Sequence, residues 1–246
     1  MFWTEKSTKW YKQAAESTKY HQAIYQEISP YIDETASVLD VGCGLGYLST
    51  EIAQKTQEVT ASDIEDRPLQ DLEERLNQDD LTNLYILKSD WSVISDKPKW
   101  DIIVSCFFKS NIEDIGRLFE YGRERLILVV SNGSENSFLP GRNTNHYQKK
   151  ADLLADNLRD RNIPFQYRKC NIQFGQPFST MAEAVEFIKH YQPNCDDTEI
   201  DTHLRSHMEI IPKDTHGNQY FLPNLKEVCI FVIEKNEYMD SVQYRR

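Results

Sequence analysis

The sequence has no long hydrophobic run. Its longest apolar stretches, LILVV at 126–130 and VCIFVI at 228–233, have the length of a strand. A membrane-spanning helix needs roughly 20 apolar residues, and the opening MFWTEKSTKW is too polar for a secretory signal peptide. We therefore expect a soluble protein with no membrane partner.

Cysteines are few, and none belongs to a CxxC pair. The five are odd in number and far apart: Cys43, Cys106, Cys170, Cys195 and Cys229. Disulfide frameworks and zinc ribbons need paired or closely spaced cysteines, so neither is expected. Free thiols are typical of a reducing compartment, which predicts a cytoplasmic protein.

Basic residues are in the minority. The chain has 28 lysines and arginines against 39 aspartates and glutamates, which gives a net charge of −11, and the basic residues are scattered among acids. Such a chain repels a phosphate backbone unless it carries a local basic patch. We expect no nucleic-acid partner.

The chain does show a regular alternation of strand-like and helix-like segments between residues 37 and 130. With 246 residues, 39% of them apolar, it is long enough for one α/β domain with additions. Runs such as RLILVVS are apolar throughout, as in parallel strands covered by helices on both faces. We predict a doubly wound, mostly parallel α/β sheet, with segments 1–36 and about 176–222 added around it.

A glycine-rich turn, SVLDVGCGLGYLSTEIAQ, occupies residues 37–54. It places Gly42, Gly44 and Gly46 at alternate positions between an apolar run and a helix-like segment, behind Asp40. Glycines let a ligand touch the main chain, and a helix start offers N–H groups to an anionic ligand group. The spacing GxGxG differs from the dinucleotide pattern GxGxxG and from the P-loop, so neither of those sites is predicted.

The stretch DVGCGLG, from Asp40 to Gly46, resembles motif I of the class I methyltransferases that use S-adenosylmethionine. The resemblance covers residues 37–131 closely and the last strands in outline. Three later strand ends fit it: TASDI with Asp63 and Ile64, then Asp90–Trp91, then Ser105 at the end of WDIIVS.

The resemblance implies a seven-stranded, Rossmann-like methyltransferase domain over 37–246, with an N-terminal helical lid (1–36) and an insertion (about 176–222) as a substrate cap. It implies S-adenosylmethionine as the cofactor, and Asp63 as an acceptor for both ribose hydroxyls. The implied cofactor-binding residues are Asp40, Gly42, Gly44, Gly46, Asp63, Ile64, Asp90, Trp91, Ser105 and Tyr20.

Four of these residues have simpler interpretations that the sequence leaves open. Asp40 either supports the glycine loop or contacts the methionine amino group of the cofactor. Asp90 is either a helix cap or a contact for the adenine amino group. Trp91 and Tyr20 either pack in a core or lie against the cofactor.

No residue is identified as catalytic. His146 and Tyr147, in the polar loop after the fifth strand, are weak candidates, because histidine titrates near neutral pH. No metal is expected, since an exposed polar helix explains the spacing of His203 and His207 as well as a metal pair does. Methyl transfer from a sulfonium is an in-line displacement that alignment alone promotes, so a missing base is no objection.

We expect methyl transfer to a small-molecule acceptor, in a pocket with apolar walls that include Trp91, Phe107 and Phe108. Two alternatives stay open. In the first, the methyl acceptor is a protein or an RNA. In the second, the chain binds S-adenosylmethionine without transferring its methyl group. The sequence identifies neither the acceptor, nor the methylated atom, nor the oligomeric state.

Overall fold

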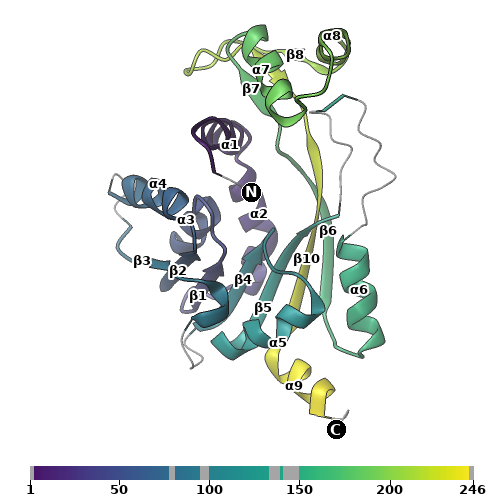
Figure 1. The fold of residues 1–246 in the computed structure, drawn as a ribbon. Coiled ribbons are helices and arrows are strands. Elements are labelled where there is room, and N and C mark those ends of the chain that lie inside the picture. Colours follow the sequence, from purple (N-terminus) through teal and green to yellow (C-terminus); the bar gives the residue numbers. More distant parts are fainter. Residues whose placement is uncertain (1–2, 78–80, 95–99, 133–138, 141–149, 244–246) are drawn as a thin grey trace. The chain divides into compact units, whose positions relative to one another are not determined.

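The chain folds into two compact units. The structure, a computed structural model, describes residues 3–77, 81–94, 100–132, 139–140 and 150–243 (Figure 1). Unit 1 takes in the described parts of Met1–Tyr20, Gly133–Gln148 and Asn171–Glu227, and unit 2 takes in those of His21–Asn132, Lys149–Cys170 and Val228–Arg246. Each unit is therefore assembled from segments that are far apart in the sequence.

Unit 2 is built on a seven-stranded sheet with the order β3-β2-β1-β4-β5-β10-β6, and the far ends of β6 and β10 belong to unit 1. The strands are β1 (Ser37–Val41), β2 (Glu58–Asp63), β3 (Leu84–Lys88), β4 (Trp100–Cys106), β5 (Gly122–Ser131), β6 (Gln166–Gln173) and β10 (Leu225–Glu234). β1 pairs in parallel with β2 and β4, β2 with β3, and β4 with β5, whereas β10 runs antiparallel to β5. The predicted doubly wound, mostly parallel sheet of seven strands is confirmed.

Helices pack on this sheet through apolar side chains. Those assigned to unit 2 are α2 (Tyr20–Ile28, whose first residue belongs to unit 1), α3 (Tyr47–Ala53), α4 (Asp66–Leu76), α5 (Ile112–Tyr121), α6 (Lys150–Asp160) and α9 (Lys235–Gln243), with the short 3₁₀ turns η1 (Ser29–Tyr31) and η2 (Trp91–Val93). Side chains of α5 and α6, such as Ile115 and Leu158, share one core with β4, β5 and β10. α3 and α4 contact β2 and β3, next to the glycine-rich turn. Because the parallel strands point the same way, their carboxyl ends meet at one edge of the sheet, where such folds bind ligands.

Unit 1 has a small sheet of its own, with the order β7-β9-β8 and antiparallel pairing. Its elements are α1 (Glu5–Thr18), β7 (Gln176–Phe178), α7 (Met181–Tyr191), α8 (Asp197–His207), β8 (Glu209–Ile210) and β9 (Tyr220–Leu222). The ring of Trp10, on α1, lies 5.2 Å from the ring of Phe187, on α7. Ion pairs join the same two helices, from Lys9 to Glu183 (2.9 Å) and from Lys6 to Glu186.

The two ends of the segment that carries most of unit 1 are hydrogen-bonded to each other. The segment leaves β6 and returns in β10, its neighbour in the large sheet. The amide of Phe174 donates to the carbonyl of Asn224 (2.8 Å), and the amide of Asn224 donates to Oε1 of Gln173 (2.6 Å). The segment between β6 and β10 therefore begins and ends at residues that are hydrogen-bonded to each other.

The structure adds detail to the sequence-based expectations. The helical opening segment is divided at Lys19, which has a left-handed backbone (φ 51°). The stretch 192–219 contains α8, the polar helix that carries His203 and His207, and β8, which was not predicted. α7 is capped by Thr180, whose hydroxyl accepts the amide hydrogen of Glu183 (3.1 Å). The carboxylate of Glu183 in turn accepts from the amide of Ser179 (3.1 Å).

The predicted domain limits do not coincide with the two units. Residues 3–20 and 176–222 belong to unit 1, whereas residues 21–36, which we included in the lid, belong to unit 2. The roles of lid and substrate cap stay predictions.

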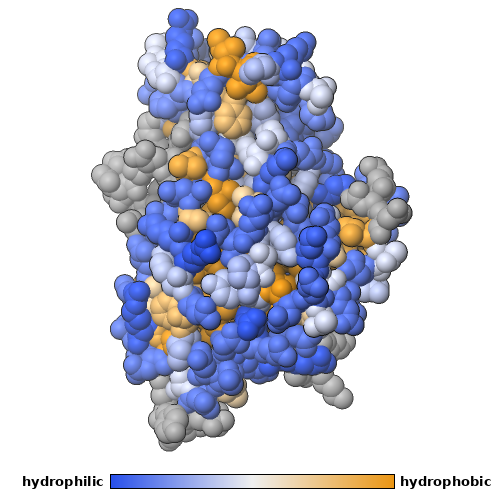
Figure 2. All heavy atoms as spheres, turned by 180° about the vertical axis from the view of Figure 1, so that it is seen from behind, coloured by the Kyte–Doolittle hydropathy of each residue, from blue (hydrophilic) through white to orange (hydrophobic). Residues whose placement is uncertain are grey.

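Among the described residues, no helix is long and apolar enough to cross a bilayer. On the face shown in Figure 2, hydrophilic side chains predominate and apolar ones form scattered patches. Scattered apolar surface of this kind is normal and indicates no particular partner.

Candidate functional site

The glycine-rich turn joins β1 to α3, and all three of its glycines have left-handed backbones. The φ angles are 71° at Gly42, 54° at Gly44 and 69° at Gly46. Residues with a Cβ rarely adopt this region, so the alternation of glycines follows from the path of the chain. The amides of Gly42 and Cys43 donate to the carbonyl of Ser62 (2.7 and 2.9 Å), which fastens the turn to the end of β2.

Gly42 and Gly46 are also needed for space. A Cβ on Gly42 would lie 2.6 Å from Cδ1 of Phe108, and a Cβ on Gly46 would lie 2.5 Å from Cδ2 of Leu72. The ring of Phe108 therefore rests directly on bare main chain. Only glycine at position 42 permits that approach.

Asp63 joins the glycine turn to the next helix. Its Oδ2 accepts the amide hydrogen of Gly44 (2.9 Å), and its Oδ1 accepts that of Glu65 (3.0 Å), just before α4. Each carboxylate oxygen has a further lone pair for a ligand hydroxyl. The carboxylate and the turn, which the sequence analysis treated as separate contacts for a cofactor, are thus bonded to one another.

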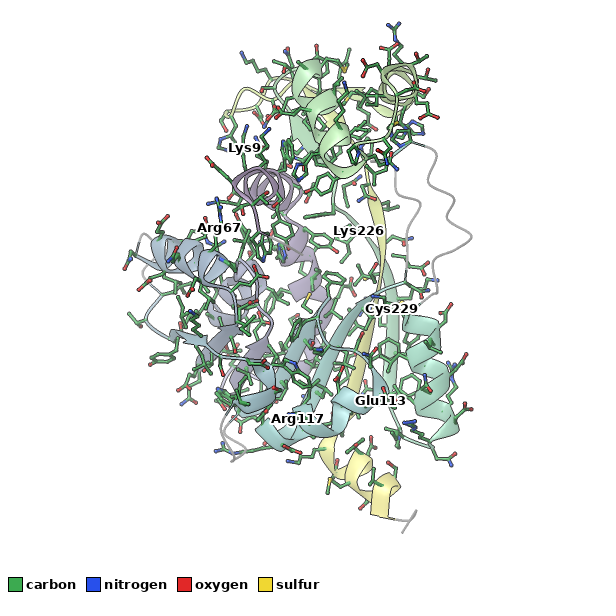
Figure 3. The ribbon with its side chains drawn as sticks, viewed as in Figure 1. Lys9, Arg67, Glu113, Arg117, Lys226 and Cys229 are labelled. Carbon is green, nitrogen blue, oxygen red and sulfur yellow. The ribbon has the colours of Figure 1, made fainter. Side chains whose placement is uncertain are left out.

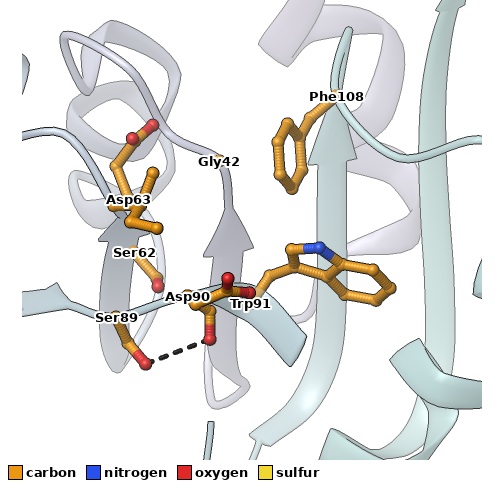
Figure 4. Close-up of a pocket in the computed structure, with 8 residues that line it drawn as sticks. Gly42, Ser62, Asp63, Ser89, Asp90, Trp91 and Phe108 are labelled. Atoms are coloured by element: carbon orange, nitrogen blue, oxygen red, sulfur yellow. Dashed lines mark hydrogen bonds between the residues drawn. The ribbon is translucent and has the colours of Figure 1, made fainter. Parts of the chain in front are cut away.

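A pocket opens at this edge of the sheet (Figure 4). It is lined by Gly42, Ser62, Asp63, Ile64, Ser89, Asp90, Trp91 and Phe108. Five of the predicted cofactor-binding residues are therefore brought together, along with Phe108, which we expected as an apolar wall. Ser62 and Ser89 were missed; each directly precedes a predicted acid at a strand end, and that position is the signal that would have found them.

For Asp90 and Trp91 the sequence left open a structural role and a place beside the cofactor, and each residue has features of both. Oδ1 of Asp90 accepts the amide hydrogen of Ser92 (2.8 Å), so Asp90 caps η2 while it lines the pocket. That hydrogen bond, helped by nearby Lys109, lowers the pKa of Asp90 below its usual range. The indole of Trp91 is half-buried, and Nζ of Lys109 lies 5.0 Å from its centroid.

Asp40 is buried behind the glycine turn, with 1% of its surface exposed. Its Oδ2 accepts a hydrogen bond from the hydroxyl of Ser49 (2.6 Å), whereas its Oδ1 has no hydrogen-bond partner among the described residues. Burial, together with a smaller contribution from the neighbouring Asp63, raises the pKa of Asp40 to about 6, although the hydrogen bond from Ser49 acts to lower it. A buried carboxylate oxygen without a donor fits a cationic or N–H group of a ligand.

Three further predictions fall outside the pocket or the described structure. The hydroxyl of Ser105 accepts from the amide of Lys109 (3.0 Å) and donates to its carbonyl (2.9 Å), so it closes a loop and does not line the pocket. Tyr20 lies in unit 1, buried, with its ring 4.4 Å from that of Phe174. His146 and Tyr147 lie outside the described residues.

The described residues contain no group of three or more His, Cys, Asp or Glu side chains that could hold a metal ion. His203 and His207, on α8, stack on each other (4.4 Å between ring centroids), and Nδ1 of His207 is 2.9 Å from the carbonyl oxygen of His203. The pocket offers the carboxylates of Asp63 and Asp90, the hydroxyls of Ser62 and Ser89, and the rings of Trp91 and Phe108. That set suits a nucleoside with a charged substituent.

Residues 39–126 match a family model described as a methyltransferase domain. Among solved structures, the chain is similar to the YcgJ protein from Bacillus subtilis, with 14% identity and a TM-score of 0.54 over 87% of this chain and 98% of that one. It is also similar to a SAM-dependent methyltransferase from Aquifex aeolicus (20% identity, TM-score 0.54, 70% and 94% covered) and to a precorrin-6y C5,15-methyltransferase from Geobacter metallireducens (10%, 0.52, 86% and 87%). No curated protein matches the sequence.

Proposed function

We propose that the chain, which belongs to the class I S-adenosylmethionine-dependent methyltransferases, transfers the methyl group of that cofactor to a small molecule by in-line displacement. The family assignment rests on the methyltransferase-domain match over 39–126 and on the seven-stranded sheet with β10 antiparallel beside β5. The acceptor and the displacement are our proposal.

We assign the cofactor to the pocket at the carboxyl edge of unit 2. The observation that carries this assignment is a set of groups that fit S-adenosylmethionine. The pocket holds the carboxylates of Asp63 and Asp90 beside the ring of Trp91. Behind the glycine turn, Oδ1 of buried Asp40 has no hydrogen-bond partner among the described residues. Asp63 would hold the ribose hydroxyls, and Asp40 would face the positively charged methionine end. Asp90 and Trp91 would contact the adenine.

S-adenosylmethionine supplies an activated methyl group, so the protein has to align the acceptor and exclude water. The pocket contributes to this with the rings of Trp91 and Phe108, which give it apolar walls. No general base is needed for an acceptor that is already nucleophilic.

A small acceptor is favoured over a macromolecule by charge. The chain carries a net charge of −11, which opposes an RNA acceptor. Aromatic walls beside the cofactor suit a small apolar or cationic body better than an extended polymer. We further propose a cytoplasmic location, and the roles of lid for residues 1–36 and of substrate cap for residues 176–222.

The test is incubation of the purified protein with methyl-labelled cofactor and a metabolite extract, followed by separation of small from large products. Label in small molecules, with release of S-adenosylhomocysteine, supports the proposal. Label that is found only in protein or RNA, when whole-cell extract is supplied, would show a macromolecular acceptor. Tight cofactor binding with no product from either extract would show a protein that binds without methyl transfer.

A further inference from the structure

Lys109 places an ammonium group beside the pocket without a carboxylate partner. Its Nζ lies 5.0 Å from the ring centroid of Trp91 and 5.5 Å from that of Phe108, and both rings line the pocket. Lys9 and Lys88 contact carboxylates, but Lys109 forms no ion pair within the described part of the chain. An aromatic ring attracts a cation without neutralising it. The full positive charge therefore stays available to a ligand.

The position of Lys109 is fixed by its own loop. The hydroxyl of Ser105, at the end of β4, bonds both the amide and the carbonyl of Lys109 (3.0 and 2.9 Å). Phe107, between them, has a left-handed backbone (φ 53°), and its amide donates to the carbonyl of Val129 (2.8 Å). Such strain in a non-glycine residue persists only where the surroundings hold it, and it is common at ligand sites.

A second cation lies nearby. Arg117 projects from α5 (Figure 3), and its guanidinium carbon is 5.9 Å from the ring centroid of Trp91. Asp90 is the acid that senses both cations, and its carboxylate already accepts the amide hydrogen of Ser92. Arg117 is already engaged by Tyr121 and Glu120 of its own helix, so Lys109 is the cation at this rim that a ligand can use.

We propose that the methyl acceptor carries a carboxylate that pairs with Lys109, an inference that rests on the proposed methyl transfer to a small molecule. The ammonium of Lys109, held beside two rings of the pocket, suits an anionic group of the acceptor. The ring of Phe108 contacts the apolar part of the same acceptor, whereas Trp91 contacts the adenine of the cofactor. The carboxylate orients the acceptor and is not itself methylated, because pairing with an ammonium lowers its nucleophilicity.

The test compares the wild-type chain with Lys109→Met, Lys109→Arg and Lys55→Met. Lys55 is an exposed lysine of the same unit and lies outside the pocket, so its replacement controls for the loss of one charge. Each protein is incubated with methyl-labelled cofactor and a metabolite extract, and labelled small molecules are separated on an anion exchanger at neutral pH. Affinity for S-adenosylmethionine is measured by calorimetry in parallel.

We expect the wild-type products to bind the anion exchanger. Lys109→Met should lower their formation at least tenfold, which is the loss expected for one charge-assisted contact, with cofactor affinity within about twofold of wild type. Lys109→Arg should keep most of the activity, and Lys55→Met all of it.

Three outcomes would overturn the inference. Neutral or cationic labelled products would show that the acceptor has no carboxylate, although small-molecule methyl transfer would stand. Equal product formation by Lys109→Met would remove Lys109 from acceptor recognition. A large loss of cofactor affinity in Lys109→Met would assign the ammonium to the carboxylate of S-adenosylmethionine. Failure of the proposed function itself is distinguishable, since no labelled small molecule would form at all.

Discussion

Asp40, buried behind the glycine turn, is the acid that we propose to face the positively charged end of the cofactor. Burial raises its pKa to about 6 in the ligand-free chain, so a large share of the molecules carry it protonated just below neutral pH. A cationic ligand group at Oδ1 favours the ionised form and releases the proton. Cofactor binding and proton release should therefore be coupled.

We predict that affinity for S-adenosylmethionine rises on the order of tenfold between pH 5 and pH 7, with proton release that disappears above pH 7. Calorimetry in buffers of different ionisation enthalpy measures both quantities. Asp40→Asn should bind weakly and show neither effect. A pH-independent affinity in the wild-type chain would place Asp40 away from the cationic end of the cofactor.

The same raised pKa affects stability with the opposite dependence on pH. The contribution of Asp40 to folding is fully present below its unfolded pKa of about 3.9 and is lost as the pH rises through about 6. In the absence of cofactor, Asp40→Asn should therefore gain stability relative to the wild type as the pH rises over that interval.

For Asp63 we predict that replacement by alanine weakens cofactor binding about 10- to 150-fold, the range for a lost charge-assisted hydrogen bond. The substitution also leaves the amides of Gly44 and Glu65 without their acceptor, so the turn should loosen. Asp63→Asn keeps one acceptor oxygen and should lose less. Calorimetry that shows unchanged affinity in Asp63→Ala would remove this carboxylate from the site.

At the scale of elements, α4 supports the glycine turn through one side chain. Arg75 donates from Nη2 to the carbonyl of Leu45 inside the turn, and its guanidinium carbon lies 4.0 Å from the ring centroid of Tyr47 at the start of α3. The helix thereby holds both the turn and the helix that follows it.

We predict that Arg75→Met raises the dissociation constant for S-adenosylmethionine about tenfold, because one charge-assisted bond to the turn is lost. Arg67→Met is the matched control, since Arg67 is exposed on the same helix. Hydrogen exchange should show faster exchange over residues 42–46 in Arg75→Met only. If the two variants bind alike, α4 does not position the turn.

The elements that carry the site could be predicted because their signals are local. Alternate glycines after an apolar strand require left-handed turns, and the acid positions follow from where parallel strands end. The fate of Ser105 could not be predicted, since its hydroxyl is used by a loop whose path depends on the left-handed backbone of Phe107. α8 was anticipated only from the spacing of His203 and His207, and its bounds could not be predicted. Only Ile200 and Leu204 of its residues are buried, too few to show a helical period in a polar stretch.

At the scale of the whole molecule, the division into two units could not be read from the sequence. Unit 1 joins the first helix to a segment more than 150 residues further along, through contacts such as Trp10 with Phe187. The buried residues of α1 are few, and nothing in their pattern identifies α7 as their partner.

We predict that Trp10→Ala destabilises unit 1 by about 3–5 kcal/mol, as expected for a large cavity in a core. Hydrogen exchange should become faster over residues 5–18 and 176–222, with β1 and β4 unaffected. Trp100→Ala is the reciprocal control, because Trp100 is buried in unit 2 and donates to Thr60 (2.9 Å). Equal loss of protection in both units would show that they unfold together.

The hydrogen bonds that Asn224 forms with Phe174 and Gln173 have a consequence for how such a protein can diversify. Because the excursion starts and ends on adjacent strands, its length is decoupled from the sheet, and the entropy of closing it grows only with the logarithm of that length. Recombination that replaces the whole segment between β6 and β10 would therefore leave the register of these two strands unchanged.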